Sequence, residues 1–255
     1  MAQLWVNGRS YSTKLIAFDK DGTLVEFHHL WGHKTWHWVE AMVTSTGGDD
    51  DLRTALFGTL GFSTEKNRVV PDGPIAVASN PKLYTVAAAV LYQHGLGWHQ
   101  AETVAQQSGT AIFGALPTAE LIRPIGDVAR TIKRLYGKNI RIAIVTSDDR
   151  IATEATLHLL GIADYVDTIV CGDDALLPNK PDPAVLRYLG QQFGVDPAQI
   201  LMVGDTESDM LFGRKAGVGG CIGVTGGAGD EKVLRETADT LIPSIAAIQV
   251  DANRY

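Results

Sequence analysis

Short apolar runs, rich in isoleucine and valine, recur along this chain and alternate with stretches of helical periodicity. Each run predicts a buried strand, and the runs lie at residues 15–18, 140–146, 165–171, 200–204 and 221–224. Apolar strands that alternate with helices are typical of a parallel sheet covered on both faces. The intervening helices are expected at residues 126–137, 149–160, 182–193 and 208–216. The pattern therefore predicts an α/β fold.

A segment of a different kind precedes the first run. Residues 3–14 contain Asn7-Gly8, and this dipeptide is the strongest signal for a two-residue hairpin. We expect a small β-hairpin that leads into the strand at residues 15–18.

Residues 25–122 separate the first core strand from the next and lack a strand pattern. Such a stretch is too long for a loop. We therefore expect two domains, a core of residues 1–24 and 123–255 and a helical domain of residues 25–122 over the C-terminal edge of the sheet. The helical signals are the periodic Phe27, Trp31, Trp38 and Met42, a helix capped by Asp49 through residue 60, another from Asn80 to Gly95, and a fourth near residues 99–107.

Charge and cysteine content exclude several classes of protein. The formal net charge of −7 over 255 residues argues against a chain-wide basic surface for nucleic acid. Cys171 and Cys221 are too few for a disulfide framework, and we interpret both as buried apolar residues. No apolar stretch is long enough for a membrane helix or a signal peptide. We expect a cytoplasmic protein with neither nucleic-acid nor membrane partners.

Two carboxylates stand directly after the first predicted core strand. Asp19 and Asp21 belong to the sequence DKDGT, in which Gly22 permits a sharp turn out of the sheet. Ligands of parallel sheets bind at this end of the strands. The alternative interpretation is an Asx turn, in which either carboxylate bonds the local backbone.

Polar residues also follow later strands. Thr146 and Ser147 carry hydroxyls suited to phosphate oxygens, although such residues equally often cap a helix. Lys180 lies in a loop stiffened by proline, and a lone lysine is usually a solvated surface charge. Asp205 and Asp209 follow the strand at residues 200–204, where acids also serve as helix caps.

The four aspartates share one pocket if these strand ends converge. Two like charges about 4 Å apart repel by about 4 kcal/mol at an effective dielectric near 20, so the group needs a cation or partial protonation. Lys180 offsets part of this charge. An all-oxygen set without cysteine or histidine favours Mg²⁺ over zinc.

Together these motifs resemble the haloacid-dehalogenase (HAD) superfamily of phosphotransferases, and within it the phosphoglycolate-phosphatase-like members. The matching elements are DKDGT at residues 19–23, Thr146 after a strand, Lys180 in NKPDP and GDTESD at residues 204–209. The resemblance covers roughly residues 14–24 and 124–245. It implies a Rossmann-like parallel-sheet core with an inserted α-helical cap domain, which residues 25–122 match by position and helicity.

The resemblance also implies a role for each residue. Asp19 would be the nucleophile that becomes an aspartyl-phosphate, and Asp21 the general acid and then the base. Thr146, with Ser147 beside it, and Lys180 would hold the transferring phosphoryl group. The Mg²⁺ ligands would be Asp19, the Asp21 backbone carbonyl, Asp205 and Asp209. The implied activity is Mg²⁺-dependent hydrolysis of a small phosphorylated metabolite.

Alternatives remain at this point. A phosphomutase of the β-phosphoglucomutase kind would use the same residues, and a non-catalytic binding protein on the same fold is the alternative of another class. Asp21 argues against dehalogenases and phosphonatases, which lack an aspartate two residues after the nucleophile. Ser147 stands where many phosphoglycolate-phosphatase-like members carry Asn. Neither the substrate nor the choice between monomer and homodimer follows from the sequence.

The start of the helical region offers candidate substrate contacts. Phe27, His28 and His29 follow soon after the catalytic loop, and we predict that they face the substrate. His29, His33 and His37 recur on one helical face. Because no further ligand accompanies them, we interpret these histidines as part of an amphipathic helix rather than as a metal site.

Overall fold

A computed structural model describes residues 2–175, 178 and 180–250. Its central sheet has six strands in the order β10-β9-β8-β3-β6-β7, and every neighbouring pair is parallel. The bounds are β3 Leu15–Phe18, β6 Arg141–Val145, β7 Thr168–Val170, β8 Ile200–Gly204, β9 Gly220–Val224 and β10 Thr240–Ile242. The structure confirms the predicted α/β class and places β3 in the middle of the sheet.

Helices cover both faces of this sheet because successive side chains of a strand point to opposite sides. Ile16 and Phe18 of β3 pack into one apolar cluster with α6 and α7, whereas Leu15 and Ala17 pack into another with α8, α9 and α10. The bounds are α6 Val128–Tyr136, α7 Arg150–Leu159, α8 Ala184–Phe193, α9 Glu207–Ala216 and α10 Glu231–Thr237. Short 3₁₀ turns span Ala163–Tyr165, Pro197–Gln199 and Ile245–Ala247.

The predicted strand at residues 165–171 is shorter in the structure than in the sequence analysis. Tyr165 ends a 3₁₀ turn, and β7 begins only at Thr168. Strand β10 and helix α10 were not predicted. Both are short, and a three-residue strand has too few positions to show a period.

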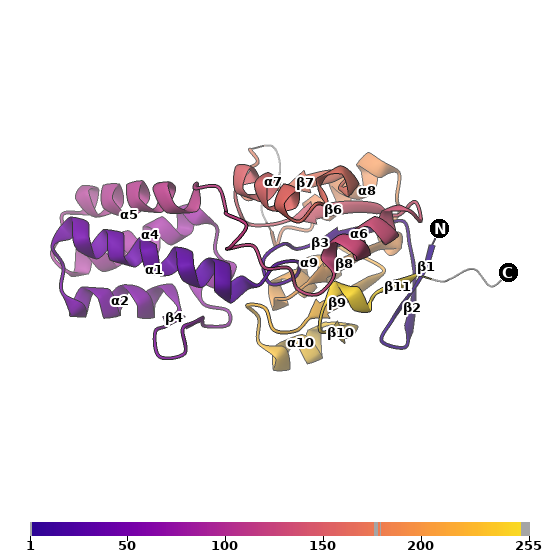
Figure 1. Cartoon of the computed structure of the whole chain (residues 1–255), viewed down its shortest axis with the longest axis horizontal. Coiled ribbons are helices and arrows are strands. Elements are labelled where there is room, and N and C mark those ends of the chain that lie inside the picture. Colours follow the sequence, from indigo (N-terminus) through magenta and orange to yellow (C-terminus); the bar gives the residue numbers. More distant parts are fainter. Residues whose placement is uncertain (1, 176–177, 179, 251–255) are drawn as a thin grey trace.

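Helices dominate the stretch between β3 and β6 and form the left half of Figure 1. They are α1 Phe27–Thr46, α2 Asp50–Leu60, α3 Pro74–Val77, α4 Asn80–Gln93 and α5 Trp98–Phe113. Two very short strands, β4 Phe62–Ser63 and β5 Arg68–Val69, pair antiparallel, so the expectation of a strand-free region was wrong there. Helix α5 also runs beyond the predicted residues 99–107.

The helical half has an apolar cluster of its own, built mainly from α1, α2, α4 and α5. Trp38 is fully buried in it, and its indole N–H donates to the Ala105 carbonyl at 3.1 Å. Asp49 caps α2 as predicted, since its side chain accepts from the Leu52 N–H at 3.0 Å. Gly47 ends α1 in the left-handed conformation.

The chain passes between the two halves through two adjacent connectors. Val25 forms an antiparallel bridge with Pro124. On either side of this bridge, the Glu26 N–H donates to the Arg123 carbonyl at 2.8 Å and the Ile125 N–H to the Leu24 carbonyl at 2.9 Å. The two connectors are therefore hydrogen-bonded to each other.

The predicted hairpin is present at the end of the molecule that lies away from the helical half (Figure 1). Strands β1 Ala2–Val6 and β2 Arg9–Thr13 pair antiparallel, and β11 Gln249–Val250 adds to the outer side of β1. Asn7 and Gly8 both have positive φ, as this type of turn requires.

Cys171 and Cys221 are buried and unpaired, as expected. Burial raises the pKa of Cys171 to about 12 and that of Cys221 to about 11. Among the described residues, none of the helices has the length and apolar character needed to cross a membrane.

Candidate active site

A cavity lies at the carboxyl ends of β3, β6 and β8. It is lined by all seven of the residues that the sequence analysis selected from the core, namely Asp19, Asp21, Thr146, Ser147, Lys180, Asp205 and Asp209. Its volume is about 50 Å³, which is room for only a few water molecules. Residues from four separate stretches of sequence thus meet in one small space.

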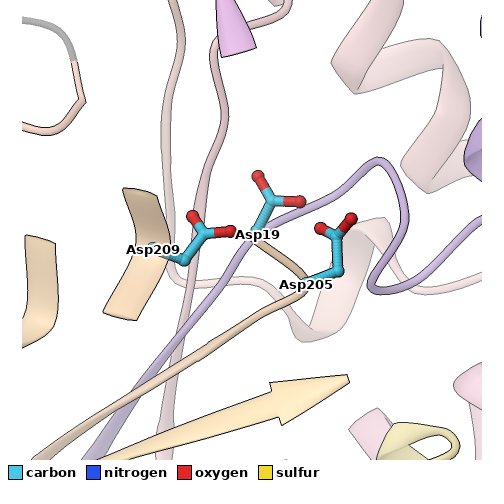
Figure 2. A group of neighbouring side chains, drawn as sticks. All are labelled: Asp19, Asp205 and Asp209. Atoms are coloured by element: carbon cyan, nitrogen blue, oxygen red, sulfur yellow. The ribbon is translucent and has the colours of Figure 1, made fainter. Parts of the chain in front are cut away.

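Three carboxylates form the floor of this cavity. Asp19, Asp205 and Asp209 are buried, and one oxygen from each lies within 4.8 Å of the others. Figure 2 shows Asp19 between the other two, with the Asp209 carboxylate directed toward it. A buried set of oxygen ligands at this separation fits a hard divalent cation such as Mg²⁺.

Lys180 supplies a positive charge to the cluster. Its Nζ donates to Asp19 Oδ1 at 2.6 Å and to Asp209 Oδ1 at 2.7 Å. Burial alone lowers the pKa of a lysine, but these two carboxylates outweigh it and raise the pKa of Lys180 above its usual value. Lys180 is therefore a charged member of the site rather than a solvated surface residue.

One ammonium group does not balance three buried carboxylates. Burial raises the pKa of Asp19 from 3.8 to about 6; Lys180 counteracts this, whereas Asp209 and Asp21 add to it. Burial and the charges of Asp19 and Asp209 likewise raise the pKa of Asp205 well above its ordinary value. Both shifts have the direction expected of carboxylates that need additional positive charge in order to ionise together.

The turn after β3 brings Asp19 close to Asp205. Gly22 has a φ of +93°, and a Cβ at this position would lie 2.1 Å from Asp205 Oδ2. Asp205 is itself fixed by the Ala228 N–H at 2.6 Å and the Thr23 hydroxyl at 3.2 Å. Only glycine fits both the backbone conformation and the space at position 22.

Asp209 has two structural roles. It is the third residue of a capping box at the start of α9, in which its Oδ2 accepts from the Thr206 N–H at 3.1 Å and the Thr206 hydroxyl at 2.7 Å. Its other oxygen, Oδ1, accepts from Lys180. Asp209 therefore caps α9 and also belongs to the carboxylate cluster around Lys180.

Asp21 lines the cavity, but its carboxylate does not belong to the group of three. Both of its oxygens accept from Lys20 Nζ, at 2.6 and 2.7 Å. Lys20 is fully buried and also forms an ion pair of 3.0 Å with Asp148. Burial lowers the pKa of Lys20, but Asp148 and Asp21 reverse the effect and leave it above its usual value.

The sequence analysis did not select Lys20 or Asp148. A lysine next to a buried strand gives no sign of its own burial, because the burial depends on an acid about 130 positions away in the chain. Asp148 could have been found, because it follows Thr146 and Ser147 at a strand end.

Thr146 and Ser147 line the cavity and do not cap a helix. The N-cap of α7 is Asp149, which comes two residues after Ser147. The Thr146 N–H donates to the Val170 carbonyl at 2.9 Å, and its hydroxyl oxygen accepts from the Asp148 N–H at 3.1 Å. This loop is thereby held against the end of β7.

Of the three substrate contacts predicted in the helical half, only one residue lines the cavity. Phe27 lines the cavity, together with Trp31 and residues 75–78, which the sequence analysis did not assign to the site. His28 and His29 do not line it: their Nε2 atoms lie 3.0 Å from the Gly227 carbonyl and 3.1 Å from the Glu120 carbonyl. Because both rings are directed at backbone carbonyls, a direct substrate contact of either histidine is not supported.

Comparison with known proteins agrees with this arrangement. The family model for haloacid dehalogenase-like hydrolases matches residues 13–217. The chain belongs to this family. A phosphoglycolate phosphatase of Rhodospirillum rubrum is 32% identical over 209 residues, which are 80% of this chain and 77% of that protein.

Other relatives match the HAD-like chain over a shorter region. A phosphoglycolate phosphatase of Neisseria gonorrhoeae is 34% identical over 120 residues, so the match covers 46% of this chain and about half of that relative, 49% of its length. A solved structure of a predicted phosphoglycolate phosphatase from Haemophilus somnus superposes with a TM-score of 0.67 at 21% identity. That match covers 92% of this chain and 95% of the other, and it supports the fold alone.

Proposed function

We propose that this HAD-like chain hydrolyses a small phosphomonoester through a phosphoryl group carried on Asp19. The observation that carries this proposal is the position of the Asp19 carboxylate, which lines a small cavity 2.6 Å from Lys180 and beside two more buried carboxylates. The relatives named as phosphoglycolate phosphatases support the same class of reaction.

In the first step an Asp19 oxygen attacks phosphorus and the bond from phosphorus to the ester oxygen breaks. Asp21 donates its proton to the departing alkoxide, and Asp19 holds the phosphoryl group as an acyl phosphate. Lys180, Thr146 and Ser147 line the same cavity and would bind the phosphoryl oxygens.

In the second step water replaces the alcohol. Asp21, now ionised, takes a proton from water as the new oxygen bonds to phosphorus. The bond between phosphorus and Asp19 then breaks, so inorganic phosphate leaves and the Asp19 carboxylate is restored. Lys20 pairs with both oxygens of Asp21 and would orient this carboxylate for each proton transfer.

Asp19, Asp205, Asp209 and the backbone carbonyl of Asp21 would hold Mg²⁺. Bound there, the cation would neutralise charge on the transferring phosphoryl oxygens and on the crowded carboxylates. The raised pKa values of Asp19 and Asp205 support the need for a cation.

Residues 25–122 would act as a cap domain on a core of residues 1–24 and 123–255. Phe27, Trp31 and residues 75–78 close the cavity from the helical side, which supports a role in excluding water during the first step.

The proposal is tested by phosphate release from a panel of phosphomonoesters with and without Mg²⁺. An Asp19→Asn variant, which keeps the shape of the side chain and removes the nucleophile, is the control. We expect release that requires both Mg²⁺ and Asp19, and a phosphoryl group that is trapped on the native protein after acid quenching.

Other outcomes would contradict the proposal in distinguishable ways. Transfer to a second hydroxyl of the same sugar, dependent on a sugar bisphosphate and with little free phosphate, would identify a phosphomutase. Absence of turnover together with absence of Mg²⁺ binding would identify a non-catalytic protein.

A further inference from the structure

The wall that the helical half contributes to the cavity is almost entirely apolar. It consists of Phe27 and Trp31 from α1 and the segment 75–78, whose side chains are isoleucine, alanine, valine and alanine. Since Asp19, Lys180 and the β-strand ends occupy the opposite side, the alcohol part of a phosphomonoester would lie against this wall.

This wall contains no positive group. Among the described residues, Lys180 is the only lysine, arginine or histidine that lines the cavity, and it is held between Asp19 and Asp209. Lys34 is the one lysine of α1, which has no arginine, and its Nζ lies 5.2 Å from the centre of the Trp31 ring. It does not line the cavity, and its charge acts on Asp148 and Asp149.

The remaining charges of the cavity are negative. Five carboxylates line it, those of Asp19, Asp21, Asp148, Asp205 and Asp209. The phosphoryl group of a substrate would use Lys180 and a divalent cation. Lys20 pairs with two of these carboxylates, Asp21 and Asp148, but does not itself line the cavity. A second anionic group on the substrate would therefore meet no further positive side chain among the described residues that line the cavity.

One polar atom of the apolar wall is unpaired. Trp31 is 6% exposed, and its indole Nε1 is buried with no hydrogen-bond acceptor in reach among the described residues. Phe27 and Phe113 hold the ring, with centroids 6.0 and 5.6 Å away. A buried donor without a partner is costly, and it is satisfied when a ligand supplies an acceptor.

We propose that the site selects short phosphomonoesters whose alcohol part is uncharged, and that the Trp31 indole N–H donates a hydrogen bond to a hydroxyl or ether oxygen of that part. The inference rests on the proposed phosphatase activity and narrows its substrate class. It places phosphoglycolate, which carries a carboxylate, and sugar bisphosphates outside that class, although the relatives are named for phosphoglycolate.

The first test compares three esters of nearly equal size: 2-hydroxyethyl phosphate, ethyl phosphate and phosphoglycolate. They differ at the far end of the alcohol part, which is a neutral acceptor, an apolar methyl group or a carboxylate. We expect kcat/KM for 2-hydroxyethyl phosphate to exceed that for phosphoglycolate at least about tenfold. It should exceed that for ethyl phosphate about three- to tenfold.

The second test removes the indole N–H with Trp31→Phe, which keeps an aromatic ring between Phe27 and Phe113. The ratio of kcat/KM for 2-hydroxyethyl phosphate over ethyl phosphate should fall toward one. Trp36→Phe is the matched control, because Trp36 lies on the same helix, is 42% exposed and does not line the cavity. The control should leave the ratio unchanged.

The third test adds a positively charged side chain to the apolar wall. Val77 lines the cavity and is 45% exposed, so Val77→Arg can be accommodated at its rim. We expect this variant to lower the ratio of KM for phosphoglycolate over KM for 2-hydroxyethyl phosphate at least about threefold.

The outcomes separate this inference from the proposed function. Turnover of all three esters with phosphoglycolate preferred would overturn the uncharged class and leave the phosphatase in place. An unchanged ratio in Trp31→Phe would overturn the role of Trp31. Failure to hydrolyse any phosphomonoester would overturn the proposed function, and this inference with it.

Discussion

At the scale of single residues, the site is dominated by the crowding of carboxylates around Lys180. Asp19 and Asp209 share its ammonium group, whereas Asp205 relies on the Ala228 N–H and the Thr23 hydroxyl. Such a cluster is costly to fold, since buried charges that lack a partner lose hydration without compensation. A glycine that packs against this cluster should therefore be sensitive to substitution.

Gly22→Ala should damage both stability and cation binding. The positive φ disfavours any side chain by about 1 kcal/mol, and the new Cβ would displace the Asp205 carboxylate. Gly8→Ala is the matched control, because Gly8 also has a positive φ but has no heavy atom within 4 Å of an added Cβ. We expect urea unfolding to show a loss of about 1 kcal/mol for the control and more for Gly22→Ala.

Titration of Mg²⁺ into both glycine variants completes the comparison. Only Gly22→Ala should bind the cation more weakly, by about tenfold or more. Equal affinities in the two variants would show that Asp205 takes no part in binding it.

Stabilisation by Mg²⁺ should depend on pH in a defined direction. The pKa of Asp19 is raised from 3.8 to about 6, so without a cation its contribution to stability is complete below the unfolded value and is lost as the pH rises through about 6. A cation binds the ionised form. The increase in Tm caused by saturating Mg²⁺ should therefore be larger at about pH 8 than at about pH 5.

Thermal unfolding in Mg²⁺ and in EDTA, at both pH values, measures this difference. We expect an increase of several degrees at the higher pH. An increase of the same size at both pH values would argue against binding through Asp19 and its neighbours.

At the scale of the element, each motif owes its position to the end of a strand or the start of a helix. Asp19 follows β3, Thr146 follows β6 and Asp205 follows β8, while α9 begins two residues after Asp205. The capping box of α9 fixes Asp209 through Thr206. Helix initiation and the geometry of the carboxylate cluster therefore depend on the same hydrogen bonds.

Thr206→Ala should weaken helix α9 and the cluster together. Loss of an N-cap costs about 1 kcal/mol, and Asp209 also loses the hydroxyl that fixes its Oδ2. Asp49→Ala removes a comparable cap from α2, and Asp49 does not line the cavity. Both variants should lose similar stability in urea, but only Thr206→Ala should lose affinity for Mg²⁺. If the two variants lost the same affinity for Mg²⁺, the capping box of α9 would have no specific role in binding the cation.

The sequence predicted elements whose signal is local. Strands β3, β8 and β9 contain no charged residue and β6 is apolar after Arg141, while the Asn7-Gly8 turn and the Asp49 cap rest on neighbouring residues. Of the seven selected core residues that line the cavity, six were selected because they follow strands, and Lys180 was selected from a loop that contains proline. Lys20, Trp31 and residues 75–78 could not be selected, because their roles depend on which distant residues pack against them.

At the scale of the whole molecule, the cavity lies where the two halves meet. Besides the connectors, Asn80 at the start of α4 donates to Asp149 at 3.0 Å, and His28 lies 3.0 Å from the Gly227 carbonyl next to the residue that binds Asp205. Any relative movement of the two halves would therefore change the shape of the cavity.

A stable mimic of phosphorylated Asp19, formed with beryllium fluoride and Mg²⁺, should change hydrogen exchange around the cavity. We expect slower exchange in residues 27–31 and 74–78, which close it from the helical side. The β1–β2 hairpin, at the other end of the molecule, is the internal reference. Binding of the mimic with exchange unchanged in both segments would contradict closure by the helical half.

The paired connectors at Val25 and Pro124 have a consequence for how such molecules can be rebuilt. The points at which the chain leaves and re-enters the sheet half are neighbours, so we expect the helical stretch to be exchangeable as one unit. A different helical insert with closely spaced ends could be spliced there without altering any strand of the central sheet. A transplanted insert would then lie next to the same cavity-lining residues of the sheet half.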